Sequence, residues 1–262
     1  MRHTLLGLLA ATVATTAAAP VPAQTAAVAA RAVAAEPRPF SVGERFSYDV
    51  HYGPVRVGRG SIEILDVQNV RGHPAWRAVF RLKGGNSLYR LDNTFQSWID
   101  TTSLASLRFH KNVREGRRER VKSFEIYEEL GVYREEGKGE FPTVAGPLDD
   151  ASFFYFVRTI PLEVGKAYAF NRYFKPDRNP VGVTVLRRER ITTDVGTFDA
   201  IVIRPVIKTS GMLAEARRTE VWLSDDPRRL VLRVRSELPF GSVTMGLQEY
   251  RPGDRPAILA ER

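Results

Sequence analysis

The chain has 262 residues, with 39 lysines and arginines against 30 aspartates and glutamates, a formal net charge of +9, and no cysteine. The lack of cysteine excludes a disulfide framework, a thiolate metal site and a cysteine-linked lipid within this sequence. The positive charge, mostly arginine, suits nucleic acid or anionic lipid. However, no nucleic-acid-binding motif accompanies it, so we expect no nucleic acid partner and interpret the arginines as solvated strand faces.

Residues 1–23 have the layout of a secretory signal peptide. Arg2 precedes a mildly apolar run from Leu5 to Ala19, and the small residues Val21 and Ala23 suit the recognition positions of signal peptidase. We therefore expect cleavage after Ala23 and a periplasmic or secreted protein with no transmembrane span after cleavage. The alternative is an uncleaved membrane anchor, for which the run is short and rich in alanine and threonine.

The rest of the chain divides into an Ala/Pro-rich leader at 24–39, expected to be disordered, a single β-rich domain at 40–250, and a polar tail at 251–262. Turn formers separate short segments of the domain, which favours about a dozen strands in meandering antiparallel order. The segment 198–206 is apolar on both faces and is expected to be covered on both sides. A period-two alternation, typical of half-buried strands, occurs at 45–52, 76–82, 107–114 and 230–235.

One segment departs from the strand pattern. Phe153, Phe156, Val157 and Ile160 follow helical spacing, an aspartate precedes them, and a proline follows. We predict a helix over 150–159 with these four side chains facing the sheet. The fold class is therefore mainly all-β: a strongly curved antiparallel sheet or incomplete β-barrel with one short helix packed on it.

The residues that could carry chemistry form no recognisable catalytic or metal-binding motif. His51, His73 and His110 lack metal-ligand spacing. The pair Asp149 and Asp150 is explained by helix capping, because adjacent carboxylates rarely aim at one point. We expect no catalytic residue, no metal and no cofactor. A hydrolase of an envelope polymer that uses these aspartates or Asp49 is the least favoured hypothesis.

Arg158 lies in the otherwise apolar helix, where a charge is costly unless it is paired. An acidic side chain on the sheet, a path to water, or an anionic group of a ligand would each satisfy it. The aromatic strand faces and the export signal favour an apolar ligand in the curved sheet. The candidate ligand-binding residues are Tyr48, Phe80, Phe153, Phe156 and Arg158.

Four segments, in the right order, resemble the bacterial envelope family called domain of unknown function 3108. They are FSVGERFSYDV at 40–50, DASFFYFVR at 150–158, GTFDA at 196–200 and EVWLSDDPRR at 220–229. The resemblance implies a secreted or periplasmic β-rich protein and offers no catalytic residues. By architecture alone the chain is similar to periplasmic lipoprotein carriers whose half-open barrel holds acyl chains.

These observations favour a non-enzymatic envelope protein that binds a lipid or another amphipathic small molecule. The alternative is a structural or interaction module that uses a sheet edge or its arginine-rich face to hold an envelope protein partner.

Overall fold

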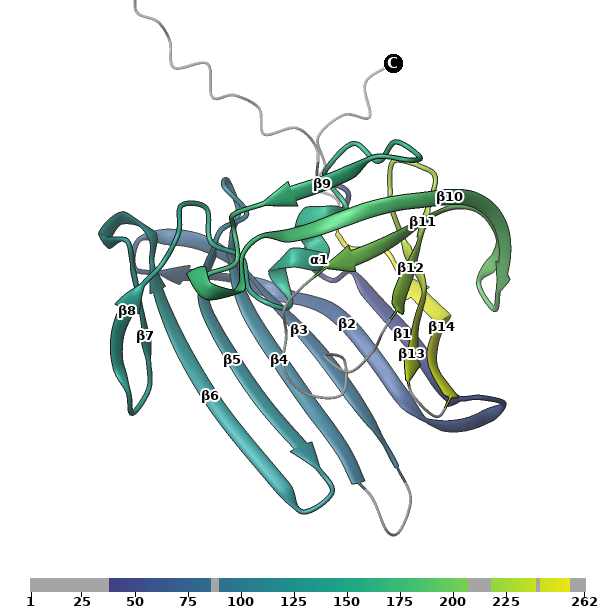
Figure 1. Cartoon of the computed structure of the whole chain (residues 1–262), viewed down its shortest axis with the longest axis horizontal. Helices are drawn as coiled ribbons and strands as arrows, with labels where there is room; N and C mark the ends of the chain where they lie inside the picture. Colours follow the sequence, from purple (N-terminus) through teal and green to yellow (C-terminus); the bar gives the residue numbers. More distant parts are fainter. Residues whose placement is uncertain (1–37, 86–89, 207–217, 239–240, 255–262) are drawn as a thin grey trace, which may run out of the picture. The chain divides into compact units, whose positions relative to one another are not determined.

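The computed structural model of the protein describes residues 38–85, 90–206, 218–238 and 241–254 (Figure 1). These residues form one antiparallel sheet of 14 strands, with a single α-helix. The expected signal peptide, the leader up to residue 37 and the tail from residue 255 lie outside the described residues. Neither the cleavage site nor the disorder of the leader is therefore tested.

The strands pair in the order β8-β7-β6-β5-β4-β3-β2-β1-β14-β13-β12-β11-β10-β9. Their bounds are β1 Arg45–Tyr52, β2 Val55–Val70, β3 His73–Gly85, β4 Arg90–Asp100, β5 Ser106–Glu115, β6 Arg118–Tyr127, β7 Val132–Glu135, β8 Gly139–Pro142, β9 Ala167–Phe170, β10 Val181–Thr193, β11 Gly196–Val206, β12 Arg218–Ser224, β13 Val231–Leu238 and β14 Gly241–Arg251.

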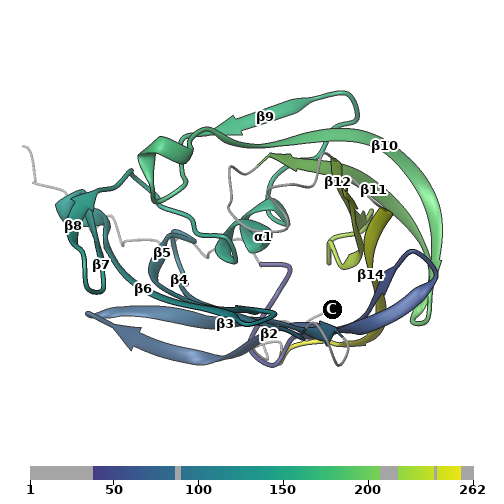
Figure 2. The same cartoon turned by 60° about the horizontal axis from the view of Figure 1, so that its bottom comes forward.

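The sheet consists of two meanders that meet at β1. Strands β1 to β8 form one meander and β9 to β14 the other, and β1 pairs with both β2 and β14. Strands β8 and β9 end the sheet and do not pair with each other within the described residues, so the sheet is curved but not closed (Figure 2). The predicted incomplete barrel is confirmed, with somewhat more strands than expected.

The period-two pattern places one row of each strand on the concave side. In β1, Phe46, Tyr48 and Val50 are buried there, while the intervening residues are more exposed. In β11, by contrast, residues 200–203 are all buried, so the cover predicted on both faces of 198–206 holds for these four residues only.

Two glycines let β2 and β3 approach closely. Gly58 lies opposite Gly84, and a Cβ atom on Gly58 would come within 2.3 Å of the Lys83 carbonyl oxygen. A Cβ on Gly84 would come within 2.4 Å of the Val57 carbonyl oxygen. Only glycine fits at either position without a shift of the backbone.

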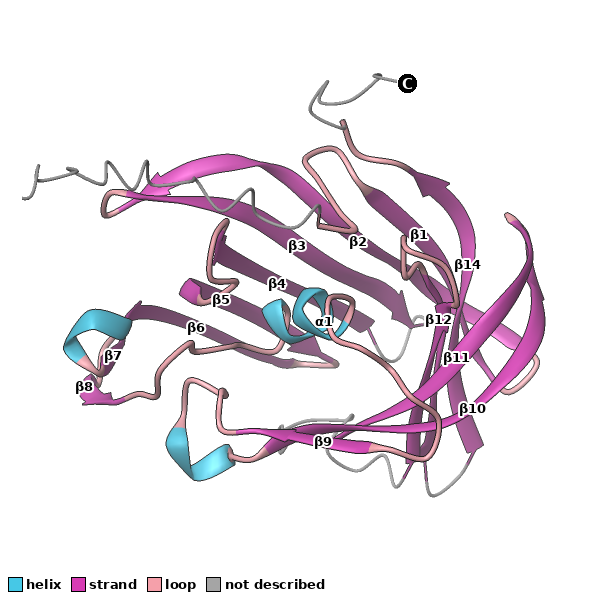
Figure 3. Cartoon of the chain, turned by 90° about the horizontal axis from the view of Figure 1, so that it is seen from above, coloured by secondary structure: helices cyan, strands magenta, loops and turns pink. Residues whose placement is uncertain are grey.

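Helix α1, Ser152–Val157, packs on the concave side of the sheet (Figure 3). It is shorter than the segment 150–159 predicted from the sequence. Of the side chains expected to face the sheet, Phe153, Phe156 and Val157 are buried, and Ile160 packs half-buried against the same core. Two further short helical turns, η1 (Glu128–Leu130) and η2 (Pro176–Arg178), lie in loops. The helices of the described part are all too short to cross a membrane.

Candidate ligand-binding face

The concave side of the sheet carries a half-buried aromatic patch beside α1, formed by Phe80, Phe95 and Phe154. Phe80 on β3 lies directly opposite Phe95 on β4. The ring of Phe154, on α1, lies 5.7 Å from that of Phe80, measured between centroids. All three residues pack against the core and are only partly buried. The patch is therefore apolar surface that the helix does not cover.

The accessible surface continues from the aromatic patch along the same face of the sheet. Leu82, the next inward residue of β3, is half-buried and lies opposite Gly60 of β2. Gly60 leaves room for Met245 of β14, because a Cβ atom on Gly60 would come within 2.6 Å of the Met245 Cε. Because Gly60 has no side chain, the flexible thioether of Met245, two strands away, can line this face.

A lysine borders the patch. The Nζ of Lys111 lies 5.0 Å from the ring centroid of Phe95 and 3.1 Å from a carboxylate oxygen of Asp150. The side chain is thus held in place by one anion while its ammonium group lies over an aromatic face. The candidate face combines apolar surface with one fixed cation.

Most of the residues predicted to bind a ligand lie elsewhere. Phe80 belongs to the aromatic patch, but Tyr48, Phe153 and Phe156 are buried in the packed core. The hydroxyl of Tyr48 donates a 2.9 Å hydrogen bond to the Val231 carbonyl oxygen, which joins β1 to β13. These contacts are internal, and a ligand-binding role of the three residues stays a hypothesis.

Arg158 is paired within the protein. Its Nη1 and Nη2 atoms donate hydrogen bonds of 2.7 and 2.9 Å to the two carboxylate oxygens of Glu44, which directly precedes β1. Nη2 also donates to the carbonyl oxygens of Pro39 and Arg228, at 3.0 Å each. Burial alone would lower the pKa of Arg158, but Glu44 outweighs it and raises that pKa. Of the three partners considered for Arg158, the structure shows an acidic side chain beside the sheet.

The sequence did not indicate Phe95, Phe154 or Glu44 as residues of a site. Phe154 lies off the helical stripe of 153, 156, 157 and 160, which was itself a signal that it is less buried than those residues. Glu44 is 114 residues from Arg158 along the chain. No local pattern could have joined those two.

The two adjacent aspartates have separate structural roles. Asp149 is fully buried, and its carboxylate accepts hydrogen bonds from the backbone N–H groups of Ala151 and Ser152, at 2.7 and 2.8 Å, and from the hydroxyls of Ser97 and Ser106. Burial raises the pKa of Asp149 to about 6, although these hydrogen bonds act in the opposite direction. The carboxylate fixes the first turn of α1 to β4 and β5.

Asp150 points to other partners than Asp149 does. It accepts a hydrogen bond from Lys111 and a 2.7 Å hydrogen bond from the hydroxyl of Tyr173. Asp49, the third acid considered for catalysis, forms a 2.6 Å ion pair with Arg56. Within residues 38–254, leaving aside the undescribed gaps, no group of three or more histidines and acids is placed to hold a metal ion.

Comparison with curated proteins gives no match. Among solved structures, the chain is similar to a β-barrel-like protein of domain of unknown function DUF1849 from Brucella abortus. The identity is 12%, the match covers 82% of this chain and 99% of that chain, and the TM-score is 0.51, which shows a shared fold. A hypothetical protein from Chlamydia trachomatis matches with 10% identity over 83% of this chain and 90% of its own, at a TM-score of 0.38.

The family resemblance drawn from the four sequence segments is confirmed by a family model. That model, described as a protein of unknown function (DUF3108), matches residues 47–248, from within β1 to within β14. Because the match spans the whole curved sheet and the helix inside it, the chain belongs to the DUF3108 family of proteins of unknown function.

Proposed function

We propose that the protein is an exported, non-enzymatic binding protein that holds an amphipathic ligand, such as a lipid or a fatty acid, on its concave face. The observation that carries this proposal is the accessible aromatic patch of Phe80, Phe95 and Phe154 beside an otherwise filled core. Covering apolar surface stabilises a complex by about 25 cal/mol per Å². A chain of methylene groups lying along this face would supply that cover.

The border of the patch supports an amphipathic ligand in preference to a purely apolar one. Lys111 lies at the edge of the patch, on Phe95, and its ammonium group is fixed by Asp150. A ligand with an anionic or polar head and an apolar tail would match that arrangement. Export is supported by the N-terminal sequence, with its basic residue, apolar run and small residues before position 24.

A second candidate function is that of an interaction module, and strand β8 favours it. All four residues of β8 are exposed, and the strand forms one end of the sheet in the described part of the chain. Such an edge offers unpaired backbone groups to a strand of a partner protein. The packed core around α1 is equally compatible with this role.

Binding of a fluorescent fatty acid to the delipidated mature protein tests the proposal. We expect micromolar binding, weakened about tenfold or more, or by at least 1.4 kcal/mol, in Phe95→Ala and Phe154→Ala. Phe141→Ala, which truncates a partly exposed ring on β8, is the matched control and should bind like the unaltered protein. If no probe binds and organic extracts of the native protein contain no lipid, the ligand-binding proposal is wrong and the interaction module is favoured.

Export has its own test. The intact mass of the protein recovered from its own envelope or medium should correspond to a chain that begins at Gln24. A mass that includes Met1 would instead indicate an uncleaved anchor.

A further inference from the structure

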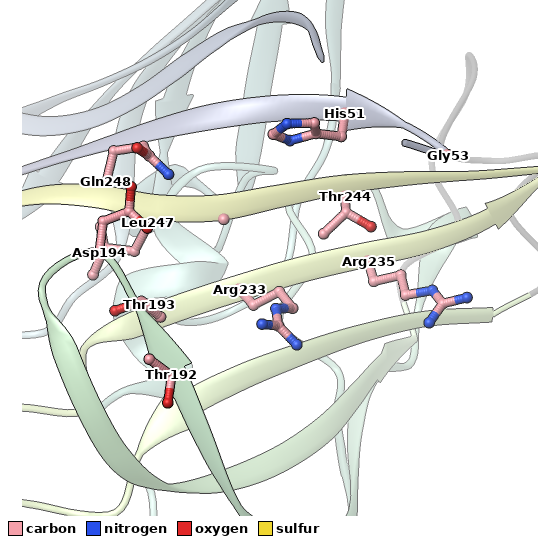
Figure 4. Close-up of a pocket in the computed structure, with 11 residues that line it drawn as sticks. His51, Gly53, Thr192, Thr193, Asp194, Arg233, Arg235, Thr244, Leu247 and Gln248 are labelled. Carbon is pink, nitrogen blue, oxygen red and sulfur yellow. The ribbon is translucent and has the colours of Figure 1, made fainter. Parts of the chain in front are cut away.

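A groove on the outer face of the sheet lies apart from the aromatic patch. The turn between β10 and β11 lies beside the outer face of β13, β14 and β1 and borders an open pocket of about 340 Å³ (Figure 4). Its walls include Arg233 and Arg235 on β13, Thr244 on β14, His51 on β1 and Thr192 at the end of β10. The walls are mainly polar, unlike the concave face.

The floor of the groove is open at Gly246. This residue lies opposite Arg233 in the β13–β14 ladder, and a Cβ atom placed on it would meet nothing within 4 Å. Next to it, Arg235, Thr244 and His51 lie opposite one another across three neighbouring strands. The space above Gly246 is therefore bordered by two guanidinium groups, a hydroxyl and an imidazole.

The two arginines of the groove differ from most of the arginines around them. On the neighbouring strands and turns, Arg187 pairs with Glu189 and Glu220, and Arg188 pairs with Asp225. Arg233 and Arg235 have no carboxylate within ion-pair distance in the described part of the chain. Neither arginine of the groove therefore has an ion-pair partner among the described residues.

Most of the described acids near the groove pair with other residues. Glu220, opposite Arg235 on β12, pairs with Arg187 and Arg204. Glu189, whose charge interacts with that of Arg233, accepts hydrogen bonds from Arg187, at 2.7 Å, and from the indole N–H of Trp222, at 2.5 Å. Asp49, opposite Gly246 on β1, is paired with Arg56. Asp194 is the one acid among the lining residues. The described lining thus carries two arginines against one aspartate.

Arg233 is also held in place. Its guanidinium carbon lies 5.6 Å from the ring centroid of Trp222, the residue opposite it on β12. A guanidinium that rests on an aromatic ring keeps its N–H donors available at its edge and loses less freedom on binding. Arg233 is half-buried and Arg235 is exposed.

We propose that this outer groove binds the phosphate group of an anionic ligand. Guanidinium groups match the geometry of phosphate oxygens, and charge-assisted hydrogen bonds of this kind are the strongest in proteins. Arg233 and Arg235 are two residues apart on one strand, so their Cα atoms are about 6.5 to 7 Å apart and both side chains border the same groove. The hydroxyls of Thr192 and Thr244 supply further donors.

The test compares two ways of disabling the groove in the mature protein. Arg233→Gln removes the fixed charge, and Gly246→Leu fills the floor without changing any charge. Arg188→Gln, which removes one positive charge outside the groove, is the matched control. Calorimetry with inorganic phosphate and pyrophosphate, and flotation with vesicles of phosphatidylcholine with or without phosphatidylglycerol, measure binding. A thermal melt of each variant confirms that it is folded.

We expect the first two variants to lose at least about tenfold in affinity and Arg188→Gln to keep it. Binding of free phosphate or pyrophosphate alone would identify a soluble phosphate compound as the ligand. Additional binding of the phosphatidylglycerol vesicles, lost in the same two variants, would identify a lipid headgroup. No binding of any probe, or an equal loss in Arg188→Gln, would overturn the proposal, because the effect would then be absent or due to overall charge.

Discussion

The pair formed by Arg158 and Glu44 should be among the most costly interactions in this protein to break. Both side chains are about 2% exposed, so neither charge reaches water. Arg158→Met keeps the length and apolar character of the stem but leaves the Glu44 carboxylate buried without its cation. Removing one partner of a buried pair costs about 3 to 5 kcal/mol. In a domain of about 200 residues this lowers the melting temperature by roughly 10 °C.

Chemical denaturation followed by circular dichroism measures this loss. The matched control is Arg188→Met, which removes an arginine that is 54% exposed and paired with Asp225 at 2.6 Å. An exposed pair contributes about 0 to 1 kcal/mol, so the control should unfold close to the unaltered protein. If Arg158→Met and Arg188→Met lose the same free energy of unfolding within about 1 kcal/mol, the reasoning from burial is wrong.

A double-mutant cycle separates the pair from the other contacts of Arg158. With Glu44→Gln as the second change, we expect the two substitutions to be non-additive by about 0.5 to 3 kcal/mol, because they remove the same interaction. Part of the loss in Arg158→Met should remain in the double variant, since the carbonyl oxygens of Pro39 and Arg228 lose their donor as well.

Three further outcomes concern stability. The pKa of Asp149 is about 6 in the folded protein against an ordinary value of 3.8, so the folded state binds more protons and stability should fall as the pH rises from about 4 to 6. A difference of this size amounts to about 3 kcal/mol, and denaturation of Asp149→Asn across that window should show a flatter pH dependence. Glu135 should behave in the opposite sense: burial would raise its pKa, but three lysine hydrogen bonds lower it to about 2 from 4.5, so its contribution is lost as the pH falls through this range. Glu135→Gln should therefore be less stable than the unaltered protein at neutral pH and equal to it at the lowest pH at which both stay folded. Phe153→Ala should lose about 3 to 5 kcal/mol and Phe154→Ala clearly less, because only the former ring is fully buried. Equal melting temperatures for these two variants would show that α1 contributes no more through its buried face than through its accessible one.

The segments with unbroken alternation were predictable, and the part of β2 with glycine in its inward row was not. The segment 45–52 coincides with β1 because Phe46, Tyr48 and Val50 mark its buried face. The longest strand, β2, has Gly58 and Gly60 in its inward row, so its apolar period is interrupted where the strand most needs small residues. A pattern of side chains cannot reveal a strand whose packing depends on their absence.

The helix was predictable in position but not in length. Its apolar spacing extends from 153 to 160, but regular helix ends at Val157. The carboxylate of Asp149 fixes the beginning, as the sequence suggested, although Ala151 occupies the capping position itself and provides no side-chain cap. The partners that hold it to β4 and β5 are serines far along the chain, which no local pattern indicates.

The candidate binding surfaces depend on strand neighbours, which the sequence does not specify. The alternation at 230–235 places Arg233 and Arg235 on one face, but it does not show that Gly246 and Thr244 lie beside them on β14. Nor does it show that Glu220, opposite Arg235 on β12, pairs with Arg187 and Arg204.

The central place of β1 in the sheet also determines the order in which the protein can be assembled. A chain emerges from the ribosome N-terminus first, so β1 can pair with β2 within a few residues but has no partner on its other edge until β14 is complete. The hydrogen bond of the Tyr48 hydroxyl and the Arg158–Glu44 pair likewise can form only after distant segments of the chain have been made. Contacts between remote parts of a chain form slowly, and an unpaired strand edge invites association with other chains in the meantime. The last strand to be made is thus the one that joins the two halves of the sheet, and a chain truncated before it keeps two meanders with no ladder between them.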